Sequence, residues 1–284
     1  MAAHPEKKAS IAQHLENVIH KMIQKKITKQ ALVHHAVLDY FKHSDTKKVQ
    51  EMITLIRDVA IDFVHSKEGA DVIIRSLALG TVKDRKAIVK SVKTQVAQMC
   101  REQHAGLVIL AIFDAVDDTK IVQKVVLSEY MKDAKNLLMD KFGRRPILHL
   151  LTPLSGRYFP PDVVSMFKGL HATLAETSKK SLADKRKELL DDISAGFLDV
   201  CAKNAEELIL SRWSSEALGE LLLRLPSDRS KALEAVAHVC CGKEASASVM
   251  NHDIGHRLIK RLVQSDLEGE SALGRTSRLP LSGV

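Results

Sequence analysis

The chain has 284 residues and a formal net charge of +8, and 45% of its residues are hydrophobic although only 4% are aromatic. A chain of this length can bury a large core, and core volume that comes mainly from Leu, Ile, Val and Ala favours helices. No apolar run approaches the roughly 20 residues that span a bilayer, and the polar sequence after Met1 is unlike a signal peptide. We therefore expect a soluble, intracellular protein.

The positive charge is concentrated near the start of the chain. Residues 1–100 carry 17 Lys and Arg against 10 Asp and Glu, whereas the remainder is nearly balanced. Such a surplus favours a polyanionic partner, although it also describes solubility. A basic partner surface is therefore expected mainly in the first third of the chain.

Helical periodicity runs through most of the sequence. Apolar residues recur three or four positions apart, as on one face of an amphipathic helix, in segments 47–65, 84–99, 120–139, 163–177 and 184–203. No stretch shows the convincing two-residue alternation of a half-buried strand. The sequence therefore predicts an all-α fold.

The helices repeat along the chain. The pattern of segment 67–74, a polar opener followed by a small residue and an apolar triplet, returns at 103–110, 36 residues later, and at 141–148 and more faintly at 203–210. Asp84 and Asp118 lie between copies and lead into apolar runs, which indicates helix starts. A unit of two helices and a turn cannot bury its apolar face alone, so the units are expected to stack into a solenoid.

Two interruptions break this period. Pro153, Gly156, Pro160 and Pro161 fall within residues 152–162, and residues 178–184 are polar, so both stretches predict exposed loops. The first marks the expected boundary between a regular and a divergent half. We expect a lead-in helix at 1–24, regular repeats at 25–152, divergent repeats at 153–265 and a disordered tail at 266–284.

Three stretches carry a resemblance to a known family. They are Lys-Phe-Gly-Arg-Arg at 141–145 leading to Leu-His-Leu-Leu-Thr-Pro at 148–153, Arg-Lys-Glu-Leu-Leu-Asp-Asp-Ile-Ser at 186–194, and Asn-His-Asp-Ile-Gly-His-Arg-Leu-Ile-Lys at 251–260. Together with the repeat, they resemble Pumilio (PUF) proteins of the Puf-A or penguin-like subfamily with its CPL region, over residues 10–265. Proteins of this group are longer, so the chain is expected to correspond to a C-terminal portion.

The resemblance implies a right-handed superhelical solenoid of Pumilio-type repeats. It also implies a nuclear, chiefly nucleolar protein that binds RNA, and DNA as well, with little sequence preference. Large-subunit ribosomal RNA processing and ribosome assembly are the implied setting, with pre-ribosomal RNA and pre-ribosomal proteins as partners.

In PUF proteins that read sequence, the second main helix of each repeat offers two polar side chains to a base edge and one planar side chain to stack between bases. By resemblance, the edge pairs here are Ala70 with Ile74, Gly106 with Leu110, Arg144 with Leu148, Glu206 with Leu210, and Gly255 with Ile259. The stacking positions are Asp71, Leu107, Arg145, Glu207 and His256. The second edge residue is apolar in every pair and cannot hydrogen-bond a base, so the base code is predicted to be lost.

Electrostatic contact with phosphates remains available, and it carries no sequence information. The candidate contacts are Lys25, Lys26 and Lys29; Lys83, Arg85, Lys86, Lys90 and Lys93; Lys141, Arg144 and Arg145; and His256. Positions 83, 86, 90 and 93 are three or four apart and are predicted to share one helix face. A merely solvated helix face would show the same lysine pattern.

Catalytic and metal chemistry have no candidate residues in the sequence. His252 and His256 are four apart, but they lack the HExxH arrangement and a third ligand, and the His34–His35 pair is read as packing or solvent-facing. The four cysteines lack CxxC spacing and are expected to be buried thiols, and Trp213 is expected to pack. No phosphate-binding loop or nucleophile elbow is present. We expect no enzyme activity, cofactor, metal or small-molecule substrate.

The resulting hypothesis is a nonspecific RNA-binding scaffold in ribosome assembly. The alternative is a helical-repeat scaffold that binds only proteins, as other helical solenoids do. The placement of charge discriminates between them, because basic residues along one continuous concave surface would favour RNA.

Overall fold

The computed structural model describes residues 5–241 and 253–272, and every regular element within them is helical, which confirms the predicted all-α class. In chain order the elements are α1 (Pro5–Gln24), α2 (Ala31–His43), α3 (Thr46–Ile56), η1 (Arg57–Asp62), α4 (Lys67–Leu79), α5 (Val82–Ser91), η2 (Lys93–Gln95), α6 (Val96–Arg101), α7 (Ala105–Ala115), α8 (Thr119–Val122), η3 (Gln123–Leu127), α9 (Ser128–Lys132), α10 (Ala134–Met139), α11 (Arg145–Leu151), α12 (Pro161–Thr177), α13 (Leu182–Lys203), α14 (Ala205–Leu210), α15 (Arg212–Arg224), α16 (Ser230–Cys241) and α18 (Asp253–Ala272).

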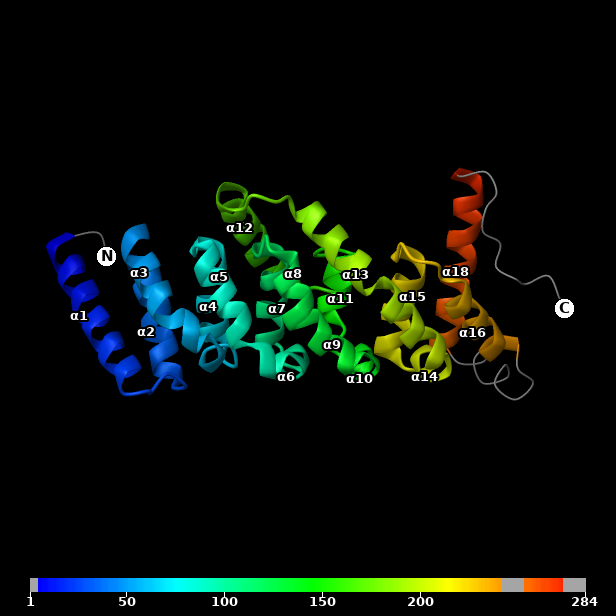
Figure 1. Cartoon of the computed structure of the whole chain (residues 1–284), viewed down its shortest axis with the longest axis horizontal. Helices are drawn as coiled ribbons and strands as arrows, with labels where there is room; N and C mark the ends of the chain where they lie inside the picture. Colours follow the sequence, from blue (N-terminus) through cyan, green and yellow to red (C-terminus); the bar gives the residue numbers. More distant parts are fainter. Residues whose placement is uncertain (1–4, 242–252, 273–284) are drawn as a thin grey trace.

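One row of helices runs the length of the molecule. In this central row α1, α2, α4, α7, α11, α15 and α18 each contact the next, and α1 and α18 lie at opposite ends (Figure 1). A second row contains α6, α10 and α14, which also contact one another in that order. Each unit buries its apolar face against its neighbours, so the predicted solenoid is confirmed.

Three of the four repeat matches occupy equivalent places, and the fourth does not. Segments 67–74, 103–110 and 141–148 lie at or just before the starts of α4, α7 and α11 in the central row. Segment 203–210 forms the end of α13 and α14, which belongs to the second row, and α15 takes the next central position. The fourth match therefore aligned a helix of the second row with helices of the central row. The pattern did not separate them, because a small residue before apolar residues occurs in both rows.

Helix α5 begins earlier than its acidic residue suggested. Thr81 is the N-cap, its side chain accepts the Asp84 backbone N–H, and the Asp84 carboxylate accepts the Thr81 backbone N–H at 2.9 Å. This reciprocal pair is a capping box, with Asp84 at the third helical position. Asp118, by contrast, caps α8 as predicted, accepting the Ile121 backbone N–H.

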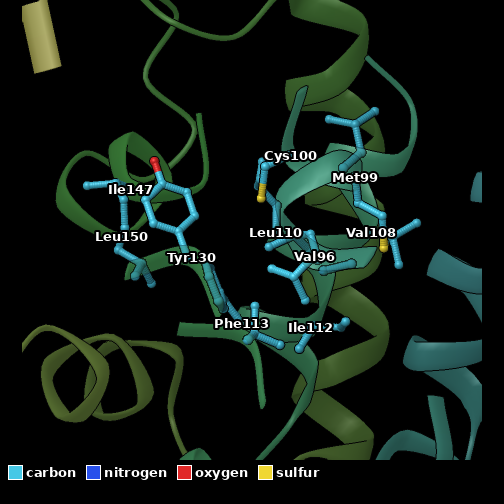
Figure 2. Packing of buried hydrophobic residues seen from close by; sticks show 14 of the residues in the cluster. Val96, Met99, Cys100, Val108, Leu110, Ile112, Phe113, Tyr130, Ile147 and Leu150 are labelled. Carbon is cyan, nitrogen blue, oxygen red and sulfur yellow. The ribbon is translucent and has the colours of Figure 1, made fainter. Parts of the chain in front are cut away.

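The densest part of the core surrounds α7, in which every residue is buried. Met99 and Cys100 from α6 and Tyr130 from α9 pack with Leu110 and Phe113 of α7 (Figure 2). A helix that is hydrophobic on all sides is stable only when neighbours cover it completely. Burial raises the pKa of the thiols of Cys100 and Cys201, as expected for buried cysteines, whereas Cys240 is only half-buried.

Helices α12 and α13 depart from the regular row and fold back over it. Helix α12 packs across α4 and α7, and α13 contacts α7, α8, α11 and α16. The connecting segment 152–160 is a loop, as predicted, but it is only partly exposed, because Tyr158 and Phe159 are buried. The regular and divergent halves consequently share one hydrophobic core.

Helix α18 continues to Ala272, so residues 266–272, which were predicted to be disordered, are helical. The rest of the predicted tail, 273–284, lies outside the described residues. No helix in the described part of the chain is long and apolar enough to cross a membrane.

Candidate nucleic-acid interface

The clearest basic surface lies on α5. Lys83, Lys86 and Lys90 line a shallow hollow of about 530 Å³ together with Asp58, Ala87 and Ser91. Lys86 pairs with Asp118 at 2.8 Å, whereas Lys83 and Lys90 have no carboxylate partner among the described residues. Two ammonium groups in this hollow are therefore available to an anionic ligand. We call Lys83, Lys86 and Lys90 the α5 lysines.

Lys93 does not continue this face as the spacing suggested. Helix α5 ends at Ser91, and Lys93 opens the separate turn η2, where its side chain is exposed. The predicted single stripe of four lysines is therefore reduced to three. The prediction failed at Lys93 because the three-to-four-residue spacing of lysines continues in the sequence past Val92, where helix α5 has already ended.

Arg85 lies between the α5 lysines in sequence but is buried, with 2% of its surface exposed. Its guanidinium donates to the carbonyl oxygens of Leu77 at 2.8 Å and of Ala78 and Ala115 at 3.0 Å, and to Thr177 Oγ1 at 2.8 Å. Burial lowers the pKa of this arginine. The prediction that Arg85 contacts phosphate was wrong, because its guanidinium donates hydrogen bonds to the last carbonyl oxygens of α4 and α7.

Lys25, Lys26 and Lys29 are exposed, but they occupy the turn between α1 and α2 rather than one helical stretch. Lys26 adopts a positive φ of 57° in this turn. Thr28, buried between them, donates from Oγ1 to Asp62 Oδ2 at 2.5 Å and thereby anchors the turn. The three lysines remain candidate phosphate contacts on a different element from the one expected.

Arg144 is also buried, with 6% of its surface exposed. Its Nη1 donates to Glu216 Oε2 at 2.5 Å and to the Trp213 carbonyl oxygen at 3.2 Å. The guanidinium carbon lies 4.7 Å from the centre of the Trp213 ring and 5.8 Å from that of Tyr158. Arg144 therefore joins α11 to α15, and its prediction as an inner-face contact was wrong.

The neighbouring basic residues remain accessible. Lys141 is exposed and Arg145 is half-buried, and both lie against the Phe142 ring, at 5.1 Å and 4.7 Å from its centre. Burial, and then the charge of Arg144, lower the pKa of Arg145. His256 is exposed on α18.

The accessible candidates do not form one continuous surface. The α1–α2 turn and α10, which precedes Lys141, lie along one edge of the molecule, whereas α5 begins at the opposite edge (Figure 1). His256 is farther away, on the last helix of the central row. Among the described residues, the predicted basic side chains therefore do not form the continuous surface that would favour RNA over a protein partner, although the α5 lysines share one hollow.

On α4, α7 and α11 the positions that would read bases are closed rather than merely apolar, whereas Glu206 is exposed and Leu210 and Ile259 are half-buried. The exposed fraction is 3% for Ile74 and 0% for Leu110 and Leu148, and Ala70 and Gly106 are buried as well. Helices α12 and α13 pack against α4, α7 and α11, the helices that carry these positions. A base edge therefore has no access to the middle of the central row.

The sequence reasoning did not single out an arginine-rich groove near the C-terminal end of the row. Arg157, Arg212, Arg257 and Arg261 line a groove of about 440 Å³ next to Trp213. Arg257 and Arg261 are one helical turn apart, and this spacing was a usable signal. Arg157 and Arg212 come from a loop and from α15, which only the fold brings to α18.

The His34–His35 pair shows no metal geometry. His34 is buried and uses both ring nitrogens, contacting Ser66 Oγ at 2.6 Å and the Thr28 carbonyl at 2.8 Å, which is the packing role predicted for it. Among the described residues, no group of three His, Cys, Asp or Glu side chains could hold a metal ion. His252, which precedes His256 by four residues, lies outside the described residues.

Comparison with known proteins places these features in a family. The CPL (NUC119) domain model matches residues 139–271. Pumilio homolog 3 of Danio rerio is 32% identical over 273 residues, which cover 94% of the chain and 43% of that protein. The crystal structure of human Puf-A in complex with DNA matches 96% of the chain and 54% of its own, with a TM-score of 0.88 and 30% identity.

A more distant structure, the Puf3 RNA-binding domain bound to Cox17 RNA, matches with a TM-score of 0.57 at 12% identity and supports the solenoid fold alone. The chain spans less than half the length of the curated Pumilio homolog 3 proteins that it matches.

Proposed function

The chain belongs to the Puf-A and Pumilio homolog 3 group of Pumilio-repeat proteins, with their CPL domain, and we propose that it binds RNA through the phosphate backbone with little sequence preference. DNA is a second ligand under this proposal, since phosphate contacts do not separate the two. The Pumilio family is one of binding proteins rather than enzymes. The observation that carries the proposal is the cluster of α5 lysines beside a closed set of base-reading positions.

The α5 lysines supply the affinity in this proposal. Lys83 and Lys90 lack carboxylate partners among the described residues, and the Lys86–Asp118 pair is exposed enough to exchange for a phosphate. Each phosphate neutralised by a lysine releases condensed counterions, which favours binding at low salt. Lys25, Lys26, Lys29, Lys93, Lys141, Arg145 and His256 add contacts outside the hollow in our proposal.

The lack of sequence preference follows from the buried edge positions. Reading a base requires a polar side chain within hydrogen-bond distance of its edge. Ile74, Leu110 and Leu148 have neither polar atoms nor exposed surface. The α5 lysines therefore bind the phosphates of a nucleic-acid ligand, and its bases make no specific contact.

We further propose large-subunit ribosomal RNA processing and ribosome assembly as the setting, in the nucleus and nucleolus. Backbone-directed binding suits a long, folded pre-ribosomal RNA whose sequence changes along the contact. The kinship with Puf-A, which has been crystallised with DNA, supports nucleic acid as the partner. Pre-ribosomal proteins are the second class of partner in this proposal, and no membrane or small-molecule partner is included.

The test is fluorescence anisotropy with two unrelated single-stranded RNAs, a structured RNA and a DNA duplex, each at low and moderate salt. The triple variant Lys83→Ala/Lys86→Ala/Lys90→Ala is compared with a control that removes equal charge, Lys168→Ala/Lys187→Ala/Lys231→Ala, at exposed positions of α12, α13 and α16. We expect the α5 variant to bind all ligands about tenfold more weakly. Its salt slope for single strands should be shallower by about 2, since each contact contributes about 0.7.

Equal losses in both triple variants would mean that only total charge matters and would reject the α5 site. A loss confined to one RNA would show that base reading survives. Absence of binding to every nucleic acid at low salt would favour the alternative, a helical scaffold that binds only proteins.

A further inference from the structure

The groove between α15 and α18 differs in chemistry from the hollow on α5. It has a volume of about 440 Å³ and is lined by Arg157, Arg212, Ser215, Glu216, Asp253, Ile254, Arg257, Leu258 and Arg261. Basic, acidic and apolar side chains therefore meet in one place. The α5 hollow has no leucine or isoleucine in its lining.

Three of the four arginines have no carboxylate to neutralise them. Arg261 pairs with Glu220 at 2.7 Å, but Arg157, Arg212 and Arg257 have no ion pair among the described residues. Glu216, in turn, is already paired with Arg144. The groove thus carries guanidinium groups in excess of its free carboxylates.

Stacking holds two of these arginines in place. The Arg212 guanidinium lies 4.8 Å from the centre of the Trp213 ring, and that of Arg157 lies 5.6 Å from the centre of Tyr158. A guanidinium stacked on an aromatic ring keeps its edge N–H groups free for a carboxylate and loses less rotamer freedom on binding. These side chains are therefore preorganised donors.

The base of the groove is apolar. Leu258 is buried with 4% of its surface exposed, and Ile254 is half-buried one helical turn before it. An apolar side chain of a ligand could cover both residues and exclude water from the arginine contacts. Interfaces of this kind, with an apolar anchor and a charged rim, are typical of peptide recognition.

We propose that this groove binds an acidic peptide segment of a partner protein. A leucine-type side chain of the segment rests on Ile254 and Leu258, and carboxylates on either side of it pair with Arg212 and Arg257. This inference goes beyond nucleic-acid binding and does not depend on it.

The groove is less suited to nucleic acid than to such a peptide. The Trp213 ring already carries the guanidinium groups of Arg144 and Arg212, and the Tyr158 ring those of Arg144 and Arg157. Among the described residues no aromatic side chain lines the groove itself, so a base has no ring there to stack on, which is what single-strand sites rely on.

The test uses the full 284-residue chain and a fluorescein-labelled probe peptide in which a central Leu-Leu pair is flanked by Glu and Asp. The double variant Arg212→Glu/Arg257→Glu is compared with Lys231→Glu/Lys260→Glu, which reverses equal charge at exposed positions outside the groove lining. We expect the probe to bind the groove variant at least about tenfold more weakly, and the control less than about twofold. Thermal unfolding of both variants checks that each is folded.

The apolar part of the proposal has its own comparison. A probe with Ser-Ser in place of Leu-Leu is expected to bind about fivefold more weakly, and Ile254→Ser should weaken binding of the Leu-Leu probe about threefold. Single-stranded RNA is measured in parallel with every variant, and its affinity should not follow these changes.

Three results would overturn the proposal. They are no binding of the Leu-Leu probe at low salt, equal binding of the Leu-Leu and Ser-Ser probes, and equal losses in the groove and control variants. If RNA, rather than the peptide, loses affinity in Arg212→Glu/Arg257→Glu, the groove belongs to the nucleic-acid surface. The α5 lysine variant separates this test from that of the proposed function.

Discussion

Two basic segments of this chain look alike in sequence and differ in structure. In α5, Lys83 and Lys90 remain in solvent, whereas at the start of α11 the guanidinium of Arg144 is buried between Trp213 and Tyr158. The difference lies in what each side chain can reach. A lysine or arginine becomes part of the core where carbonyl oxygens at a helix end or a carboxylate can accept its hydrogen bonds. A side chain without such an acceptor stays in solvent and is available to a ligand.

Arg85 shows the same rule within a single helix. It lies between Lys83 and Lys86 in sequence, yet it turns inward to the carbonyls that end α4 and α7. A buried guanidinium is tolerated only when its donors are satisfied, because desolvating a charge costs several kcal/mol.

A buried acidic hub accompanies these arginines where α12 and α13 fold back. Asp114 is fully buried on α7 and accepts hydrogen bonds from His149 at 2.9 Å, His171 at 2.7 Å and Arg186 at 3.2 Å. Lys185, also buried, donates to the Asp114 carbonyl at 2.5 Å. The hub thus connects α11, α12 and α13 to the centre of the row.

The largest expected effect comes from Arg85→Ala. The change removes the guanidinium donor from the carbonyls of Leu77 and Ala115 and leaves that of Ala78 with the Thr177 hydroxyl alone, and it should lower the free energy of unfolding by about 3 to 5 kcal/mol. Urea denaturation measures it, with Lys83→Ala as the exposed control on the same helix, expected within about 0.5 kcal/mol. Equal stability of the two variants would refute the division between buried and exposed cations.

Asp114→Asn should lower the free energy of unfolding by about 2 to 3 kcal/mol at pH 7. The change removes the negative charge that faces Arg186 and the imidazoles of His149 and His171. Burial alone would raise the pKa of Asp114, but its partners outweigh burial and hold the pKa well below its ordinary value. A depressed folded-state pKa gives stability that is present above the unfolded pKa of about 4 and is lost as the pH falls below it.

Urea midpoints measured between pH 7 and pH 3 therefore sharpen this prediction. The gap between the wild type and Asp114→Asn should narrow as the pH falls below about 4, where the carboxylate of the unfolded chain takes up a proton. A gap that widens between about pH 4 and pH 3 would contradict the proposed sign.

The smallest of these effects is expected at Arg144. Arg144→Ala removes the pair with half-buried Glu216 and two aromatic contacts, and should lower the free energy of unfolding by about 2 kcal/mol. Lys141→Ala, three residues earlier and exposed, should leave stability within about 0.5 kcal/mol and weaken RNA binding slightly. A stable Arg144→Ala variant with reduced RNA affinity would reinstate Arg144 as a ligand contact.

The sequence alone predicted the all-α class, the stacked repeats and the loss of base reading. The first two rest on local information, namely apolar spacing and a small residue at a helix start. The loss of base reading rests on the PUF resemblance, which assigns Ile74, Leu110 and Leu148 as edge positions, and it stays a prediction. The predicted site was less accurate. Arg85 and Arg144 were misassigned, and the groove at Arg157, Arg212 and Arg257 was not singled out.

The tertiary structure decided which charges face solvent and which residues meet across the chain. Arg144 and Glu216 are 72 positions apart, and Arg85 and Thr177 are 92 apart, so no local pattern connects them. Periodicity reports one helix face at a time. It specifies the central row because each helix of that row buries its face against the next, whereas it did not indicate that α12 and α13 fold back over the row. Whether a lysine or arginine is free depends instead on the acceptors that distant helices bring to it.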